Sequence, residues 1–232
     1  MVALLTHESV DAMAAALAAE ITAALTEAVD ARGAASLVAS GGSTPAPLYR
    51  ALAGTDIDWS RVTVTLADER WVDPDSHVSN EALLRGTFLT GAARFVPLKT
   101  AAATATEGEA EANAAQEAIP LPYDVTILGM GGDGHTASLF PHADGLTEAL
   151  RADQPRRLMA LTPKELPGHA PFARMTMTLP ALLASHRIVV MISGAEKRAV
   201  FEQALAGSDV FDMPIRAILN QTETPVDVHW AP

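Results

Sequence analysis

The chain has 232 residues, no cysteine and a formal charge of −12, because 28 Asp and Glu outnumber 16 Lys and Arg. A chain of this length can bury a core of its own, so we expect one domain over residues 1–232, and the lack of cysteine excludes disulfides, thiolate metal sites and thiol nucleophiles. The acidic balance disfavours a nucleic-acid partner and, taken by itself, an anionic substrate as well.

Apolar periodicity predicts helices and strands in alternation along most of the chain. In chain order, the expected elements are a helix over Ser9–Arg32, a strand over Ala35–Ala39, a helix from about Ala46, a strand over Val62–Leu66, a helix near Ser79–Phe88, a strand over Arg94–Leu98, a helix over Glu107–Glu117, strands over Asp124–Leu128, Arg157–Leu161 and Ile188–Ile192, a helix over Ala195–Leu205 and a last edge strand over Val226–Trp230. This alternation is typical of an α/β domain with a parallel or mostly parallel sheet. No apolar run is expected to be long enough to cross a bilayer, and the N-terminus lacks the basic start of a signal peptide, so we expect no membrane partner and a cytoplasmic location.

Polar or Gly-rich segments follow several of these strands. Parallel strands bring their carboxyl ends to one edge of the sheet, which is where α/β proteins bind ligands. The segments are Ser40–Pro45, Asp68–Arg70, Gly129–His135 and the stretch that contains Gly194 and Lys197. Their convergence predicts a ligand site at that edge.

The first two segments offer groups that bind anions. In Ser40–Pro45 the small residues and the following helix start favour a phosphate, although a Ser or Thr that simply caps the helix is the alternative. Asp68–Arg70 is either a local ion pair on a solvated loop or an arginine held by its acidic neighbours to grip a phosphate. Asn80 either caps its helix, which we favour, or reaches the substrate.

His135 directly follows the glycine segment. At a strand end it would project into the site with Asp133 near enough to orient it, as a general base requires, and the alternative is a histidine that caps a helix over Thr136–Phe140. The run Gly129–Gly134 also matches the dinucleotide-binding pattern, but Asp133 would place a carboxylate against the pyrophosphate, so we reject a nucleotide. The histidines lack a metal-binding pattern, so neither a metal nor a cofactor is expected.

Taken in order, these segments resemble the glucosamine-6-phosphate isomerase/6-phosphogluconolactonase family. The segments that carry the resemblance are Ser40–Pro45, Asp68–Val72 with Ser79-Asn80 following, Leu128–Pro141, Arg174–Leu179 and Gly194–Lys197. The resemblance implies a Rossmann-like domain, shared with ribose-5-phosphate isomerases and CoA transferases, and a sugar-6-phosphate substrate.

The resemblance also implies roles for individual residues, with His135 and Asp133 at the reacting end. The residues implied to bind the phosphate are Gly42, Ser43, Thr44, Arg70, Arg174 and Lys197. Without the resemblance, Arg174 would be interpreted as an exposed residue that starts a strand.

Two positions separate the branches of this family. Deaminase members have a tyrosine where Arg70 stands and an acidic residue where Phe140 stands, and this chain is similar to the lactonase members at both. The resemblance therefore implies hydrolysis of 6-phospho-D-glucono-1,5-lactone to 6-phospho-D-gluconate in the oxidative pentose phosphate pathway, without a cofactor, by a monomer or small homo-oligomer. The alternatives are a glucosamine-6-phosphate deaminase and a non-enzymatic domain that senses a sugar phosphate.

Overall fold

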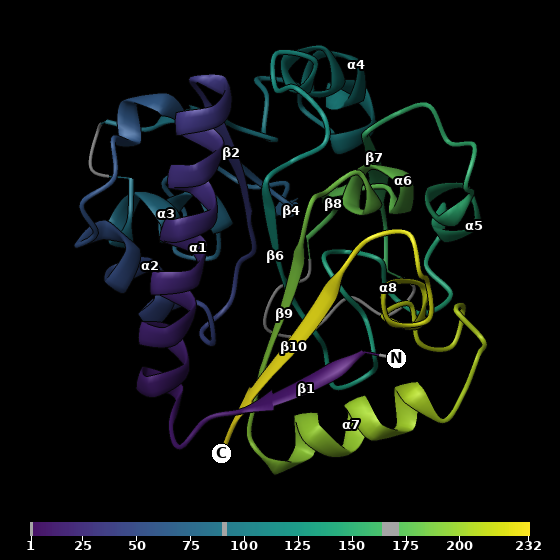
Figure 1. The fold of residues 1–232 in the computed structure, drawn as a ribbon. Helices are drawn as coiled ribbons and strands as arrows, with labels where there is room; N and C mark the ends of the chain where they lie inside the picture. The colour runs from purple at the N-terminus through teal and green to yellow at the C-terminus, as the bar shows by residue number, and fades with distance from the viewer. Residues whose placement is uncertain (1, 90–91, 164–171) are drawn as a thin grey trace.

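The computed structural model of the protein describes residues 2–89, 92–163 and 172–232, and within them seven strands form the main sheet (Figure 1). From edge to edge these strands are β1 (Ala3–Thr6), β10 (Val226–Ala231), β9 (Ile188–Ser193), β6 (Val125–Gly129), β2 (Ala35–Ala39), β3 (Val62–Leu66) and β5 (Arg94–Val96). Every neighbouring pair runs parallel. The α/β fold with a mostly parallel sheet is therefore confirmed.

Helices flank this sheet, with α1, α2 and α3 on one side of the strands and α5, α6, α7 and α8 on the other (Figure 1). The helices are α1 (Val10–Arg32), α2 (Ala46–Ala53), α3 (Asn80–Thr87), α4 (Ala105–Gln116), α5 (Leu146–Leu150), α6 (Leu179–Leu183), α7 (Ala195–Leu205) and α8 (Arg216–Leu219). All five residues of β2 are buried, as expected for a strand covered on both faces. The core therefore lies in two layers, one on each face of the sheet.

α1 supplies much of one layer, because Met13, Leu17, Ile21 and Leu25 have no exposed surface. The helix packs against α2, β2 and β10. Its 23 residues are long and apolar enough to cross a membrane by length and composition alone, so the expectation that no run reaches this length was wrong. The many alanines of α1 give it this hydropathy, while its larger apolar side chains pack into the protein.

A second, smaller sheet was not expected. It consists of β4 (Asp68–Arg70), β8 (Arg174–Met177) and β7 (Leu158–Leu161), all antiparallel, so the strand predicted near Arg157–Leu161 lies outside the main sheet. A hydrogen bond of 2.7 Å from the Met177 N–H to the Ala67 carbonyl joins it to the end of β3. β4 escapes prediction because it is three residues long and carries only charged side chains.

The order of the strands fixes where a ligand can bind. From β2 the chain proceeds through β3 to the edge at β5, then returns to β6 on the other side of β2. Connections that leave neighbouring strands in opposite directions open a crevice at their carboxyl ends, here between β2 and β6. The predicted edge strand was misplaced, because β10 is paired on both sides and the sheet ends beyond it at β1, a short run that the periodicity did not reveal.

Candidate active site

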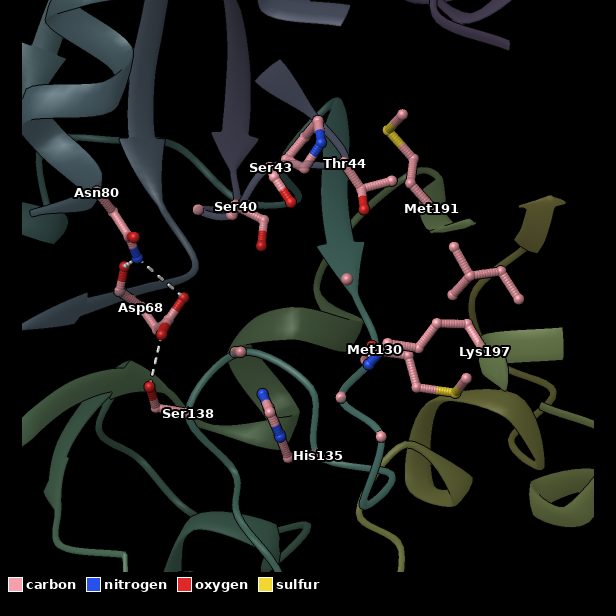
Figure 2. Close-up of a pocket in the computed structure, with 18 of the residues that line it drawn as sticks. Ser40, Ser43, Thr44, Asp68, Asn80, Met130, His135, Ser138, Met191 and Lys197 are labelled. Carbon is pink, nitrogen blue, oxygen red and sulfur yellow. Dashed lines mark hydrogen bonds between the residues drawn. The ribbon is translucent and has the colours of Figure 1, made fainter. Parts of the chain in front are cut away.

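A pocket of about 510 Å³ opens at the carboxyl ends of β2, β6 and β9 (Figure 2). Every residue that the sequence analysis proposed for the site lines it, namely Gly42, Ser43, Thr44, Arg70, Asp133, His135, Arg174 and Lys197. The structure therefore brings the polar segments together at the crevice between β2 and β6. Among the described residues, no group of three or more His, Asp or Glu side chains is arranged to hold a metal ion.

Asp133 and His135 form a hydrogen-bonded pair in this pocket. His135 Nδ1 lies 2.6 Å from Asp133 Oδ1, and the same oxygen accepts the backbone N–H of His135 at 3.1 Å. Burial alone would raise the pKa of Asp133, but the hydrogen bond and charge of His135 outweigh it, so this pKa lies below its usual value. An ionised Asp133 holds a proton on Nδ1, which leaves Nε2 of the neutral imidazole as a proton acceptor.

The glycines before His135 have a steric task. A Cβ on Gly131 would lie 2.0 Å from His135 Nδ1 and 2.5 Å from Asp133 Oδ1, so only glycine leaves room for the pair. Gly134 has a φ of 80°, and a Cβ there would lie 2.8 Å from the Met213 side chain. These requirements account for two of the three glycines that match the dinucleotide-binding pattern, Gly131 and Gly134, without a pyrophosphate.

Residues 136–139 form a tight turn, so the helix considered for this segment is absent. Ala137 has a φ of 48°, in the left-handed region, and the Leu139 N–H donates to the Thr136 carbonyl at 2.9 Å. His135 therefore caps no helix, and that alternative was wrong. The turn directs Phe140 back toward His135, and the two ring centroids are 4.2 Å apart.

Arg70 and Arg174 lie opposite each other in the small sheet. Arg174 is 2% exposed, so the interpretation of an exposed residue was wrong. Burial lowers its pKa, Asp68 and Glu69 oppose this effect, and the charge of Arg70 adds to it. Like charges opposed across a strand pair destabilise a sheet, and the charges of Asp68 and Glu69 offset this repulsion at Arg174.

The guanidinium group of Arg70 is held by backbone, although the backbone N–H of Arg70 donates to the neighbouring Glu69 carboxylate at 2.7 Å. One guanidinium nitrogen, Nη1, donates to the Val78 carbonyl at 2.6 Å, and Nε is buried with no hydrogen-bond partner among the described residues. In the described part of the chain, no ion pair joins this guanidinium to Asp68 or Glu69. The local ion pair is therefore absent among the described residues, and the acidic neighbour Glu69 holds the backbone of Arg70 but not its guanidinium group.

Glu69 instead stabilises the start of α3. Its carboxylate accepts the backbone N–H groups of Asn80 and Glu81, each at 2.8 Å, and the Ser79 hydroxyl at 3.0 Å. Burial raises the pKa of Glu69, an effect that these hydrogen bonds and the Arg70 N–H oppose. The glutamate therefore serves the fold beside the pocket and does not line it.

Asn80 was expected to cap α3, but Ser79 does so, with its Oγ accepting the Ala82 N–H at 3.1 Å. Asn80 lines the pocket and its side-chain amide donates to the Asp68 carbonyl at 2.8 Å. A Cβ on Gly41 would lie 1.9 Å from Asn80 Oδ1, so this glycine leaves space for the amide. The second of the two possibilities, an Asn80 within reach of a ligand, therefore fits the structure.

The segment after β2 keeps its polar groups for the pocket. The N-cap of α2 is Pro45, which makes no side-chain capping bond, so neither Ser43 nor Thr44 caps the helix as the alternative supposed. Thr44 Oγ1 lies 3.2 Å from Ser193 Oγ at the end of β9. Because no side chain of the described residues bonds to its first turn, α2 presents backbone N–H groups of the kind that attract anions.

Lys197 reaches the pocket from the first turn of α7. Its Nζ donates to the Met130 carbonyl at 2.8 Å. Burial lowers its pKa, and the charges of Asp133 and Glu196 oppose that shift. This ammonium group is therefore coupled to the carboxylate that orients His135.

The cations form two groups around His135. Lys197 lies beside Met130, on the other side of His135 from Asp68 and Asn80 (Figure 2). The charges that act on Arg174 are those of the small sheet, whereas those that act on Lys197 come from the glycine segment and α7. The cations that the resemblance implies for phosphate binding thus form two cationic walls of one pocket, Arg70 and Arg174 on one and Lys197 on the other.

Among the lining side chains that were not expected as site residues are Ser138, Phe140 and Asp68, the last of which was considered only as a neighbour of Arg70. The buried Asp68 carboxylate accepts a hydrogen bond from the Ser138 hydroxyl (Figure 2). A signal was present, since Asp68 begins the segment that contains Arg70 and the other two lie within five residues of His135. Their convergence depends on the turn at 136–139, which the sequence pattern did not predict.

The fold and this pocket define a member of a known class of sugar-phosphate proteins. The model of the family described as "Glucosamine-6-phosphate isomerases/6-phosphogluconolactonase" matches residues 8–230, and the chain belongs to this family.

Relatives within the family carry a more specific name. The chain is 43% identical over 228 residues to a protein of Rhizobium meliloti (strain 1021) named 6-phosphogluconolactonase, with 97% of each chain covered. It is 42% identical over 231 residues to a Pseudomonas putida protein of the same name, covering 97% of this chain and 92% of that one. The crystal structure of a 6-phosphogluconolactonase from Shewanella baltica OS155 superposes with a TM-score of 0.96 at 43% identity, over 100% of this chain and 98% of that chain.

Proposed function

We propose that the protein hydrolyses 6-phospho-D-glucono-1,5-lactone to 6-phospho-D-gluconate. The observation that carries the proposal is the pair of Asp133 and His135, with Nδ1 and Oδ1 2.6 Å apart, in a pocket that also holds three cationic side chains. A general base can activate water for attack on an ester, and the cationic side chains can bind a phosphate on the same substrate. The relatives named for this activity match the chain over nearly its full length.

His135 is the general base in this proposal, and Asp133 orients it. Nε2 takes a proton from a water molecule as its oxygen attacks the lactone carbonyl carbon, which gives a tetrahedral intermediate. The bond from that carbon to the ring oxygen then breaks, and His135 returns the proton to the ring oxygen. The products are the open-chain hydroxyl and a carboxylic acid, which ionises in water. A positioned base of this kind contributes about 10²- to 10⁴-fold to the rate.

The phosphate of the substrate is bound, in this proposal, by the cations and by the segment after β2. The residues are Gly42, Ser43, Thr44, Arg70, Arg174 and Lys197. A phosphate held far from the reacting carbon fixes the carbonyl in front of His135, so that binding energy is used for orientation.

Phe140 favours the lactonase over the deaminase. The deaminase alternative requires an acidic residue at this position, whereas the structure places an aromatic ring 4.2 Å from the imidazole ring, measured between centroids. The carboxylate that orients His135 is Asp133. This arrangement supplies a base for water but lacks the second carboxylate that the deaminase branch uses.

The test is hydrolysis of freshly prepared 6-phosphogluconolactone, followed by coupled oxidation of the 6-phosphogluconate released. We expect His135→Ala to lower turnover by at least about 100-fold and to leave inhibition by 6-phosphogluconate within about threefold of the wild type. Ammonia release from glucosamine 6-phosphate by the wild type should stay at background. Wild-type turnover in His135→Ala, or ammonia release at a rate that exceeds lactone hydrolysis, would overturn the proposal.

A further inference from the structure

We propose that Phe140 is a positioning residue for His135: its ring holds the imidazole in the orientation in which Nδ1 meets Asp133 and Nε2 faces the pocket. The inference rests on the proposed function, since it assigns His135 the role of base. It concerns a contact between side chains and assigns Phe140 no contact with the reacting atoms.

The contact between the two rings is built by the turn that separates them. The ring planes of His135 and Phe140 are inclined by 31°, with centroids 4.2 Å apart. The turn is anchored through Ser138, whose hydroxyl donates to the Asp68 carboxylate and whose N–H donates to Thr176 Oγ1 at 3.1 Å. Because both anchors belong to the small sheet, the position of Phe140 is fixed independently of His135.

His135 needs such a second restraint. The hydrogen bond to Asp133 fixes one atom of the imidazole, and a ring held at one atom can still tilt about that bond. The His135 side chain is 31% exposed, whereas Phe140 is 8% exposed, so the phenyl ring is the better fixed of the two. An aromatic contact of this kind favours one arrangement over its alternatives by about 2- to 10-fold.

The same phenyl ring also borders one of the cationic walls. The guanidinium carbon of Arg174, Cζ, lies 5.8 Å from the Phe140 ring centroid. Phe140 is thus in contact with both the base and a cation of the pocket, and it sets the spacing between them. Loss of the ring removes the surface against which both groups are placed.

The experiment compares Phe140→Leu with Phe140→Tyr, which keeps the ring. We expect kcat of Phe140→Leu to fall about 10-fold with KM changed less than threefold, and Phe140→Tyr to retain kcat within about twofold. Phe95→Leu is the matched control, because the guanidinium carbon of Arg85 lies 5.5 Å from the Phe95 ring centroid and Phe95 does not line the pocket. This control should keep the kcat of the wild type.

A second measurement separates the inference from the proposed function. In the wild type the carbon-bound ring protons of His135 should show a ring-current shift in the NMR spectrum that disappears in Phe140→Leu and persists in Phe140→Tyr. If the wild type fails to hydrolyse the lactone while this pattern holds, the proposed function fails and the positioning contact stands. An unchanged kcat in Phe140→Leu, a loss shared equally by Phe95→Leu, or a failure of Phe140→Tyr to retain activity overturns the inference.

Discussion

Acidification from pH 8 to pH 5 should destabilise the protein through His229. This histidine is 1% exposed in β10, its Nδ1 lies 3.0 Å from His7 Nε2, and its own Nε2 is buried with no hydrogen-bond partner among the described residues. Burial lowers the pKa of His229 from 6.5 to about 4, with the charges of Glu20 and Asp227 opposing the shift and those of His7 and Arg187 adding to it. The folded protein therefore keeps His229 neutral where the unfolded chain charges it.

The sign and size of the effect follow from proton linkage. As the pH falls below about 6.5 the unfolded chain takes up a proton that folded His229 refuses until about pH 4, so the free energy of unfolding decreases across this window. The two pKa values give a loss of about 2 kcal/mol between pH 8 and pH 5, and of about 3 kcal/mol by pH 4. Well above pH 6.5, His229 is neutral in both the folded and the unfolded chain, and this loss of stability is absent.

Urea denaturation at a series of pH values measures the effect. The free energy of unfolding of His229→Gln should depend less steeply on pH than that of the wild type, by about 2 kcal/mol over the range from pH 8 to pH 5. His77→Gln, at an exposed histidine outside the sheets, should follow the wild type. An NMR titration of His229 in the wild type gives the same information where the variant does not fold. Equal pH slopes for the wild type and His229→Gln, or a His229 that titrates near 6.5, would refute the reasoning.

Two further predictions concern the pocket. Gly131→Ala should lower kcat about 100-fold, because its Cβ would lie 2.0 Å from the His135 ring, whereas Gly86→Ala, with nothing within 4 Å of its Cβ, should keep wild-type kinetics in the coupled assay. Arg70→Ala and Lys197→Ala should each raise KM for the phosphorylated lactone about 10- to 100-fold and change KM for unphosphorylated gluconolactone by less than about threefold. A variant that raises KM equally for both lactones has not lost a phosphate ligand. That result would mean that the substituted cation lies near the reacting carbonyl and not near the phosphate.

The main sheet was predictable where a strand is buried on both faces. The bounds of β2 were predicted to the residue, because its short apolar run ends abruptly at Ser40, and those of α7 because Gly194 precedes it and its polar spacing is helical. β1 and β4 were missed for opposite reasons. β1 is an edge strand of only four residues, three of them apolar, and is too short to show an alternating pattern, whereas β4 is charged throughout and has no apolar residue.

The site was predictable as a set of segments and not as a set of contacts. Topology brings the carboxyl ends of parallel strands together, which is why residues after β2 and β6 were expected in one pocket. The burial of Arg174 and the fit of Asn80 over Gly41 depend instead on the small sheet and on α3. Such contacts join residues far apart in the chain, so local sequence patterns do not predict them.

The net charge of −12 was misleading about the pocket for a physical reason. Asp133 and Asp68, which line the pocket, and Glu69, which lies beside it, are already bonded: Asp133 to His135, Asp68 to Ser138 and Glu69 to the start of α3. Each of these hydrogen bonds offsets part of the negative charge of a carboxylate, and Arg70, Arg174 and Lys197 also line the cavity. A small anion responds to the field within the cavity walls, whereas nucleic acid responds to an extended surface. The net negative charge therefore disfavours nucleic acid but does not disfavour a small anionic substrate. The paired KM measurements on the two lactones test this directly.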